Sequence, residues 1–180
     1  MTPEELRQRL ESKLGEIRHY AGEVLPQVIA ADAVDSFKEN FETESFDGKA
    51  WPDVKRRDPN SPWYGFEYGN TGTYTPPHTG IGRPQSRQRK NFNPERTTAK
   101  ILHGQNEELK NAIQARIEPG HVVISNEKPY AEVHNYGGKA KVFGKHPFSM
   151  PQRQFMGVTD KLTDRIYDKI KRDIKRILNS

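Results

Sequence analysis

The sequence predicts an α+β fold, in which helices pack against a small, mainly antiparallel sheet and one long arm is irregular. Apolar residues recur at helical spacing near both ends of the chain, and two short strand-like runs flank a Pro-Gly turn. With 180 residues, a single domain spanning 1–180 is expected. We divide it into N-terminal helices at 1–47, an extended arm at 48–94, and an α+β core with a C-terminal helix at 95–180.

The composition predicts a small core. Hydrophobic residues make up 32% of the chain and charged residues 29%, and the 14 glycines do not bring the apolar share to the typical level of about half. We therefore expect either that part of the chain is extended or that neighbouring subunits supply part of the burial. The absence of cysteine excludes disulfides and thiolate metal sites. No apolar run approaches the roughly 20 residues that span a bilayer, and the polar, acidic start is unlike a secretory signal, so no membrane contact is expected.

Two helices are expected at the N-terminal end, at residues 3–20 and 24–44. Residues 2–5 supply a capping threonine, a first-turn proline and two acids, and Pro26 is expected to bend or end the first helix. The first helix carries an apolar stripe of Leu6, Leu10, Leu14 and Ile17. We interpret this stripe as core, with packing against a neighbouring subunit as the alternative.

The arm at 48–94 has an unusual composition, with seven of the 13 prolines and seven aromatic residues. Aromatic residues are enriched at interface hot spots, so we expect the arm to reach an adjacent subunit. The expected contact residues are Trp63, Tyr64, Phe66 and Tyr68. The basic run at 83–90 supports a rival hypothesis, because cations beside aromatic rings also suit single-stranded nucleic acid; a solvated loop is the simpler interpretation.

The region from 95 onward is expected to alternate helices and strands. A helix is predicted over 95–113 with an interruption at Gly104, followed by an antiparallel hairpin around the turn at 118–121. A short helix at 129–136 should end at two glycines, and a basic strand or loop should follow at 139–146. The stripe at 158–178 predicts a long final helix that packs across the sheet.

Several of these motifs together resemble a known family. After the strand comes P-Y-A-x-x-H-x-x-G-G, starting at Pro129, and then P-x-R-x-F-x-G, starting at Pro151. Upstream, residues 41–52 match F-x-x-x-x-x-x-G-x-x-W-P, and residues 101–113 are similar to "I-L, then L-x-x-S-I" with Ala112 in place of the serine. In order and spacing, over roughly residues 30–178, the chain resembles the phage virion-morphogenesis and tail-completion proteins.

The resemblance implies a structural phage protein of the head–tail junction or the tail end, assembled in the bacterial host cytoplasm and retained in the virion. It implies a ring, sixfold in the family, that contacts neck, connector or tail-tube proteins, with the passing DNA as a further candidate partner. Because a ring closes by rotation, its contacts are heterologous. Beyond the arm, the expected subunit-contact residues are Tyr130, His134, Lys139, Lys141, Lys145, Arg153 and Phe155.

No catalytic, cofactor-binding or metal-ligating residues are predicted. The six histidines include no H-x-x-x-H pair, and neither a Walker-type loop nor a G-x-G-x-x-G is present. Two alternatives remain: a DNA-binding protein that uses the basic run 83–90, and a metal-dependent nuclease that uses His134, although such a histidine more often fixes a turn. Arg153 is expected to pair with a carboxylate, either within the subunit or across to a neighbour.

Overall fold

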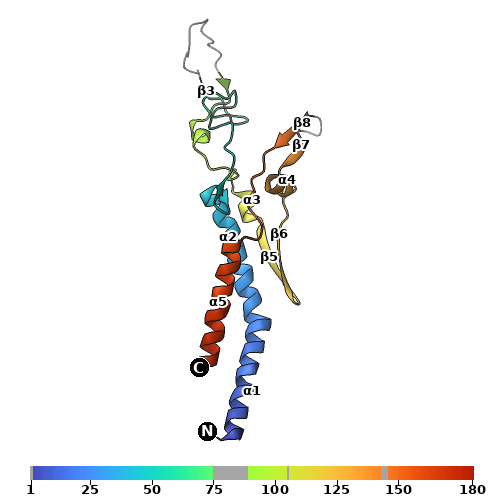
Figure 1. The fold of residues 1–180 in the computed structure, drawn as a ribbon. Helices are drawn as coiled ribbons and strands as arrows, with labels where there is room; N and C mark the ends of the chain where they lie inside the picture. Colours follow the sequence, from blue (N-terminus) through green and yellow to red (C-terminus); the bar gives the residue numbers. More distant parts are fainter. Residues whose placement is uncertain (1, 75–88, 105, 143–145) are drawn as a thin grey trace.

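The computed structural model describes residues 2–74, 89–104, 106–142 and 146–180, and it confirms the α+β class. Figure 1 shows an elongated molecule built on a stalk of three helices, α1 Pro3–His19, α2 Leu25–Thr43 and α5 Asp160–Asn179. Both chain termini lie at the free end of the stalk (Figure 1). At the other end, the arm and a lobe formed by α4 Ala131–Tyr136, β7 Gly138–Val142 and β8 His146–Met150 diverge from each other (Figure 1).

The first two helices form one continuous rod, so of the two outcomes expected at Pro26, a bend or an end, the end is wrong. A π-helix, η1 Tyr20–Val24, joins α1 to α2. In a regular α-helix Pro26 would leave the carbonyl of residue 22 without its donor and crowd it. The π turn shifts the register, because the N–H of Leu25 bonds back to the carbonyl of Tyr20, five residues earlier. The wider turn therefore accommodates the proline without ending the rod.

Helix α5 packs along the rod, not across a sheet as predicted. Thr159 caps its first turn, accepting a hydrogen bond of 3.1 Å from the N–H of Leu162. Its main helix neighbours are α2 and α1. Polar contacts fix the register: the Lys169 ammonium lies 2.6 Å from the buried Asp32 carboxylate, and the Tyr20 hydroxyl donates to Asp173 at 3.2 Å. The apolar stripe of α5 thus completes a helical stalk.

Within the described residues, the strands form four separate two-stranded antiparallel ladders. They are β1 Ser45–Phe46 with β2 Lys49–Ala50, β3 Thr73–Tyr74 with β4 Arg89–Lys90, β5 Ile113–Glu118 with β6 His121–Asn126, and β7 Gly138–Val142 with β8 His146–Met150. The predicted hairpin at 118–121 is confirmed by the pairing of Glu118 with His121, and β5 and β6 lie against α2.

The segment 95–113 is mostly non-helical, so the predicted helix there is wrong. It contains a 3-10 turn, η2 Pro94–Thr97, and a single α-helical turn, α3 Glu108–Asn111. Leu102, Gly104 and Glu107 all have positive φ, between 51° and 61°, which interrupts a right-handed helix. The predicted short helix is present as α4 Ala131–Tyr136 and ends at Gly137, whose φ is +71°.

The core lies where the stalk meets the arm and the lobe. Phe41 and Phe155 are fully buried, with ring centroids 5.1 Å apart, and Trp51 packs edge-on against Phe41 at 5.6 Å. The other buried members are Ala33 and Phe37 of α2, Leu109 of α3, Ile113 of β5, Ala131 of α4 and Leu162 of α5, together with Ile101 in the segment between η2 and α3. A single cluster therefore connects segments from all three sequence regions.

Candidate assembly surface

The base of the arm is fixed to the end of α2 by one arginine. Arg57 holds the Glu44 carboxylate with two parallel hydrogen bonds of 2.8 and 2.6 Å, and it also donates to the carbonyl of Ala99 at 2.9 Å. The same carboxylate accepts from the N–H of Ile101 at 2.5 Å. The Arg57 hydrogen bonds, ahead of the other interactions, hold the pKa of Glu44 below its usual value. A bidentate pair of this kind is directional, so the arm leaves the body at a defined angle.

A second arginine strengthens this attachment. Arg56 donates to the carbonyls of Ala99 and Lys100 at 2.9 and 2.8 Å. Burial, followed by the positive charges of Arg96 and Arg57, lowers the pKa of Arg56 to about 10, so its guanidinium stays charged at neutral pH. Together, the two arginines link residues 56–57 to the backbone carbonyls of residues 99 and 100.

Beyond this base, the arm is an irregular hairpin. Residues 65–74 run antiparallel to 89–93, through the β3–β4 pair, a bridge between Phe66 and Phe92, and a bond from the N–H of Asn93 to the carbonyl of Gly65 at 2.8 Å. A side chain at Gly65, whose φ is +60°, would overlap the Phe92 ring. No alternation of apolar and polar residues marks strands in this part of the sequence, because each strand is only two residues long and turns interrupt the pairing.

Aromatic rings stabilise the arm from within. Tyr74 and Phe92 stack with centroids 4.8 Å apart, and Tyr64 contacts them at 5.1 and 5.8 Å. Trp63 meets Phe66 edge-on at 5.0 Å. Two aromatic residues remain available on the surface, because Trp63 is 50% exposed and Tyr68 is 90% exposed. Of the four arm residues expected to contact a neighbour, these two are accessible, whereas Tyr64 and Phe66 are half-buried in the arm.

Arg153 and Phe155 belong to the interior of the subunit. Arg153 is 6% exposed and donates to the backbone carbonyls of Pro52 and Asp53 at 2.8 and 3.0 Å, where a carboxylate was expected. Burial lowers the pKa of this guanidinium, and the nearby Asp53 charge opposes the shift. The second signature motif therefore joins the lobe to the base of the arm, and neither residue lies on the surface of the subunit.

Asn135, the neighbour of His134, links α4 to residues 155 and 156 through its side chain. The buried amide of Asn135 accepts from the N–H groups of Phe155 and Met156, both at 2.9 Å, and donates to the carbonyl of Met156 at 3.1 Å. No local pattern predicts this contact, since an asparagine two residues before a glycine pair is usually interpreted as part of a turn.

The lobe presents the remaining expected contact residues. Tyr130 is 38% exposed and donates to the Glu108 carboxylate at 3.0 Å. Lys139 and Lys141 are exposed on β7. Lys145 lies outside the described residues, as do residues 83–88 of the basic run.

His134 borders a hollow of about 340 Å³ between α3 and α4. Its ring is half-buried, and within the described structure its Nδ1 has no hydrogen-bond partner. Burial, and secondarily the charge of Arg153, lowers the pKa of His134. The imidazole is therefore neutral at pH 7. The hollow is also lined by Leu102, His103, Gly104, Asn106, Glu108, Leu109 and Tyr130.

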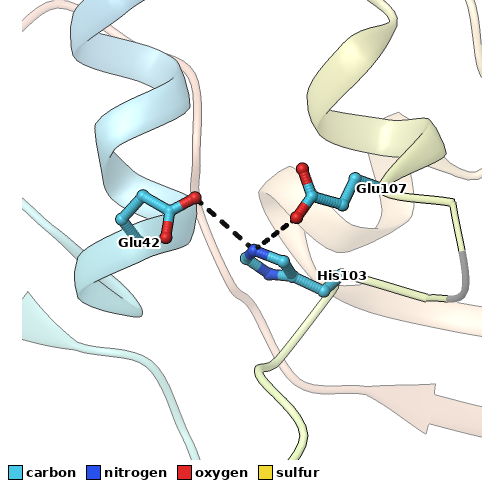
Figure 2. Close-up of side chains that lie close together, drawn as sticks. All are labelled: Glu42, His103 and Glu107. Atoms are coloured by element: carbon cyan, nitrogen blue, oxygen red, sulfur yellow. Dashed lines mark ion pairs between the residues drawn. The ribbon is translucent and has the colours of Figure 1, made fainter.

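A cluster that the sequence analysis missed lies beside this hollow. Figure 2 shows His103 between two carboxylates, with its Nε2 at 3.6 Å from Glu42 and 3.3 Å from Glu107. The sequence signal for this cluster was the H-x-x-x-E spacing of His103 and Glu107. In a helix this spacing would place both side chains on one face, although the segment is not helical in the structure. Among the described residues this is the one group of three potential metal ligands, and it does not include His134. Hydrogen bonds from Lys100 and Lys110 lower the pKa of Glu42 to about 2, so the carboxylate stays ionised. Its negative charge is balanced by these two ammonium groups and needs no metal ion. We interpret the cluster as an ion-pair network that ties α2 to residues 100–110.

The comparison with protein families identifies the chain. Residues 73–175, more than half of its length, match the model of the phage virion morphogenesis family. The chain therefore belongs to this family, which confirms the resemblance and gives the protein a structural role in the phage virion. No curated protein and no solved structure gives a significant match. Among the described residues, no helix is both long and apolar enough to cross a bilayer.

Proposed function

We propose that this protein assembles as a ring, sixfold as the resemblance implies, at the head–tail junction or tail end of a phage. The arm of each subunit contacts the next subunit. The observation that carries the proposal is the position of Tyr68, which is 90% exposed on an arm that is stabilised internally and anchored by Arg57. A large exposed ring on a well-anchored support is characteristic of an interface, because little conformational entropy is lost when it is covered.

The divergence of the arm and the lobe supports a heterologous contact. The two project from the same end of the stalk in different directions (Figure 1), so a neighbour related by rotation can place its lobe against this arm. On the arm the contact uses Trp63 and Tyr68, and on the lobe it uses Tyr130, Lys139 and Lys141. Cationic side chains can lie over aromatic faces in such a contact. The completed ring then contacts neck, connector or tail-tube proteins.

The test compares a double arm variant with a matched surface variant. Trp63→Ala/Tyr68→Ala removes the exposed rings of the arm, whereas Tyr167→Ala removes a ring that is 57% exposed on α5. Sedimentation velocity over a range of concentrations should show ring-sized species for the unaltered protein and for Tyr167→Ala. The arm variant should remain smaller. It should also fail to complete particles when it is added to an assembly reaction from which the unaltered protein has been left out. Equal assembly by all three proteins would contradict the proposal.

A further inference from the structure

The first turns of α1 carry an apolar face that the subunit does not cover. Leu6, Leu10 and Leu14 are 46%, 56% and 53% exposed, and α1 contributes no buried residue. Successive leucines are four residues apart, which places all three along one side of the helix. The expectation that this stripe is core is therefore wrong for these three residues. Three large exposed apolar side chains on one helix face indicate a contact surface.

Further along the stalk, the same side of the rod is covered by α5. Nearer α2, Ile17 is half-buried and Tyr20 is buried and bonded to Asp173 of α5. Helix α5 ends at the level of Lys13, whose ammonium lies 2.7 Å from the hydroxyl of Ser180. Figure 1 shows α1 extending beyond this point as a single helix. The N-terminal part of the stripe, including Leu6 and Leu10, therefore lies past the end of the helix that covers the rest of this side.

These exposed turns are nevertheless well formed. Thr2 and Glu5 make a capping box, in which the Thr2 hydroxyl accepts from the Glu5 N–H at 3.2 Å and the Glu5 carboxylate accepts from the Thr2 N–H at 2.7 Å. Glu4 and Glu5 also lie at the positive end of the helix dipole. The leucine face is thus presented on an ordered helix before any partner arrives.

We propose that the leucine face of α1 binds the same face of a second copy of this chain, with the two helices antiparallel. The spacing is symmetric about Leu10, so a two-fold axis there places Leu10 against Leu10 and Leu6 against Leu14 of the second copy. Arg7 and Glu11 flank one edge of the stripe, 73% and 62% exposed, and pair with each other at 3.0 Å. In the antiparallel dimer these residues lie along the same edge of the contact in both copies, so Arg7 of one copy can pair with Glu11 of the other, and the two helix dipoles oppose each other.

This dimer contact is independent of the ring. It lies at the free end of the stalk, whereas the arm projects from the opposite end (Figure 1). It is also isologous, since the same face serves both copies, whereas ring contacts are heterologous. Either contact can therefore fail while the other persists, and variants of the arm and of α1 separate the two.

Disulfide cross-linking of the full chain tests the proposal, because the protein has no cysteine of its own. Leu10→Cys should form a disulfide-linked dimer on mild oxidation at least about tenfold faster than Gln8→Cys, an exposed position on the opposite side of α1, because pairing raises the local thiol concentration. An equal mixture of Leu6→Cys and Leu14→Cys should link readily, whereas Leu6→Cys alone should link as slowly as Gln8→Cys. Equal rates at positions 8 and 10, or rapid linking of Leu6→Cys alone, would overturn the proposal.

A non-covalent measurement completes the test. Leu10→Glu places four like charges around the two-fold axis, together with Glu11 of each copy, and should abolish the dimer in sedimentation equilibrium. Gln8→Glu adds the same charge on the opposite side and should leave the dimer intact. These measurements are made on the Trp63→Ala/Tyr68→Ala background, where ring formation does not obscure the dimer. A monomeric parent on that background, or dimers that survive Leu10→Glu, would refute the α1 contact without affecting the ring.

Discussion

At the residue scale, a few buried polar side chains connect the lobe to the rest of the subunit. Asn135 satisfies three backbone groups of Phe155 and Met156, and Arg153 satisfies two carbonyls at the base of the arm. Buried backbone groups without partners are costly, so these side chains make the path of residues 153–156 specific. Phe155 adds the apolar contribution through Phe41.

Asn135→Ala should lower the free energy of unfolding by roughly 2–4 kcal/mol, because it leaves the buried N–H of Phe155 and two part-buried backbone groups of Met156 without their partner, at about 1–3 kcal/mol each, with partial relief from water. Glu132→Ala, at an exposed position of the same helix, should change it by less than about 0.5 kcal/mol. Urea unfolding monitored by circular dichroism measures both. Similar midpoints for the two variants would refute the role assigned to Asn135.

The family motifs could be recognised in the sequence, but the structural roles of their individual residues could not be predicted from it. His134 attracted the functional hypothesis because histidine titrates near neutrality, whereas its neighbour Asn135 makes the bonds that hold residues 155 and 156 against α4. Arg153 was expected to meet a carboxylate and instead binds carbonyls of Pro52 and Asp53. Such partners lie about 100 residues away in the chain, so no local pattern predicts them.

At the element scale, local patterns predicted helices and turns well where the chain obeys one period. The 118–121 hairpin and the short helix before Gly137 formed as expected, because their turn chemistry is local. The errors at Pro26 and over 95–113 arose where backbone geometry overrides composition, through a π turn in the first case and positive φ angles in the second. The packing of α5 on α1 and α2 depended on tertiary contacts that an amphipathic stripe does not specify.

Arg57→Ala should loosen the arm without unfolding the stalk. The change removes the bidentate bond to Glu44 and leaves that half-buried carboxylate without its main partner, at a cost of about 1–3 kcal/mol. Limited chymotrypsin digestion should cut at the arm aromatics faster than in the parent. Arg116→Ala, which removes an arginine that is 75% exposed on β5, serves as the control and should be cut at the parental rate. Unchanged digestion of Arg57→Ala would show that the arm is held by other means.

The ion pairs of Glu42 with Lys100 and Lys110, which link α2 to the segment after η2, should weaken in acid. In the folded protein the pKa of Glu42 is about 2, below its ordinary value of 4.5, so its stabilising contribution is complete above about pH 4.5 and is lost as the pH falls towards 2. In Glu42→Gln, the urea midpoint should fall less steeply over this window than in the parent. Glu39→Gln, at an exposed position of the same helix, should follow the parent. Parallel pH profiles for all three proteins would contradict this assignment.

At the scale of the whole molecule, the low apolar content corresponds to an elongated shape with a small core. The surfaces that we propose as contacts are separated: the arm and the lobe lie at one end, and the exposed leucines of α1 lie at the other (Figure 1). A chain with so much exposed surface for its length is suited to burying part of it in an assembly. This interpretation connects the family assignment with the proposed ring and with the second, independent contact through α1.

Electron microscopy of the purified protein, alone and bound to tail tubes, tests the central claim most directly. The account predicts closed rings in which the arm of each subunit, around Trp63 and Tyr68, lies against the lobe of the adjacent subunit. Rings in which every arm folds back on its own subunit, or single unassociated subunits on the tube, would contradict it.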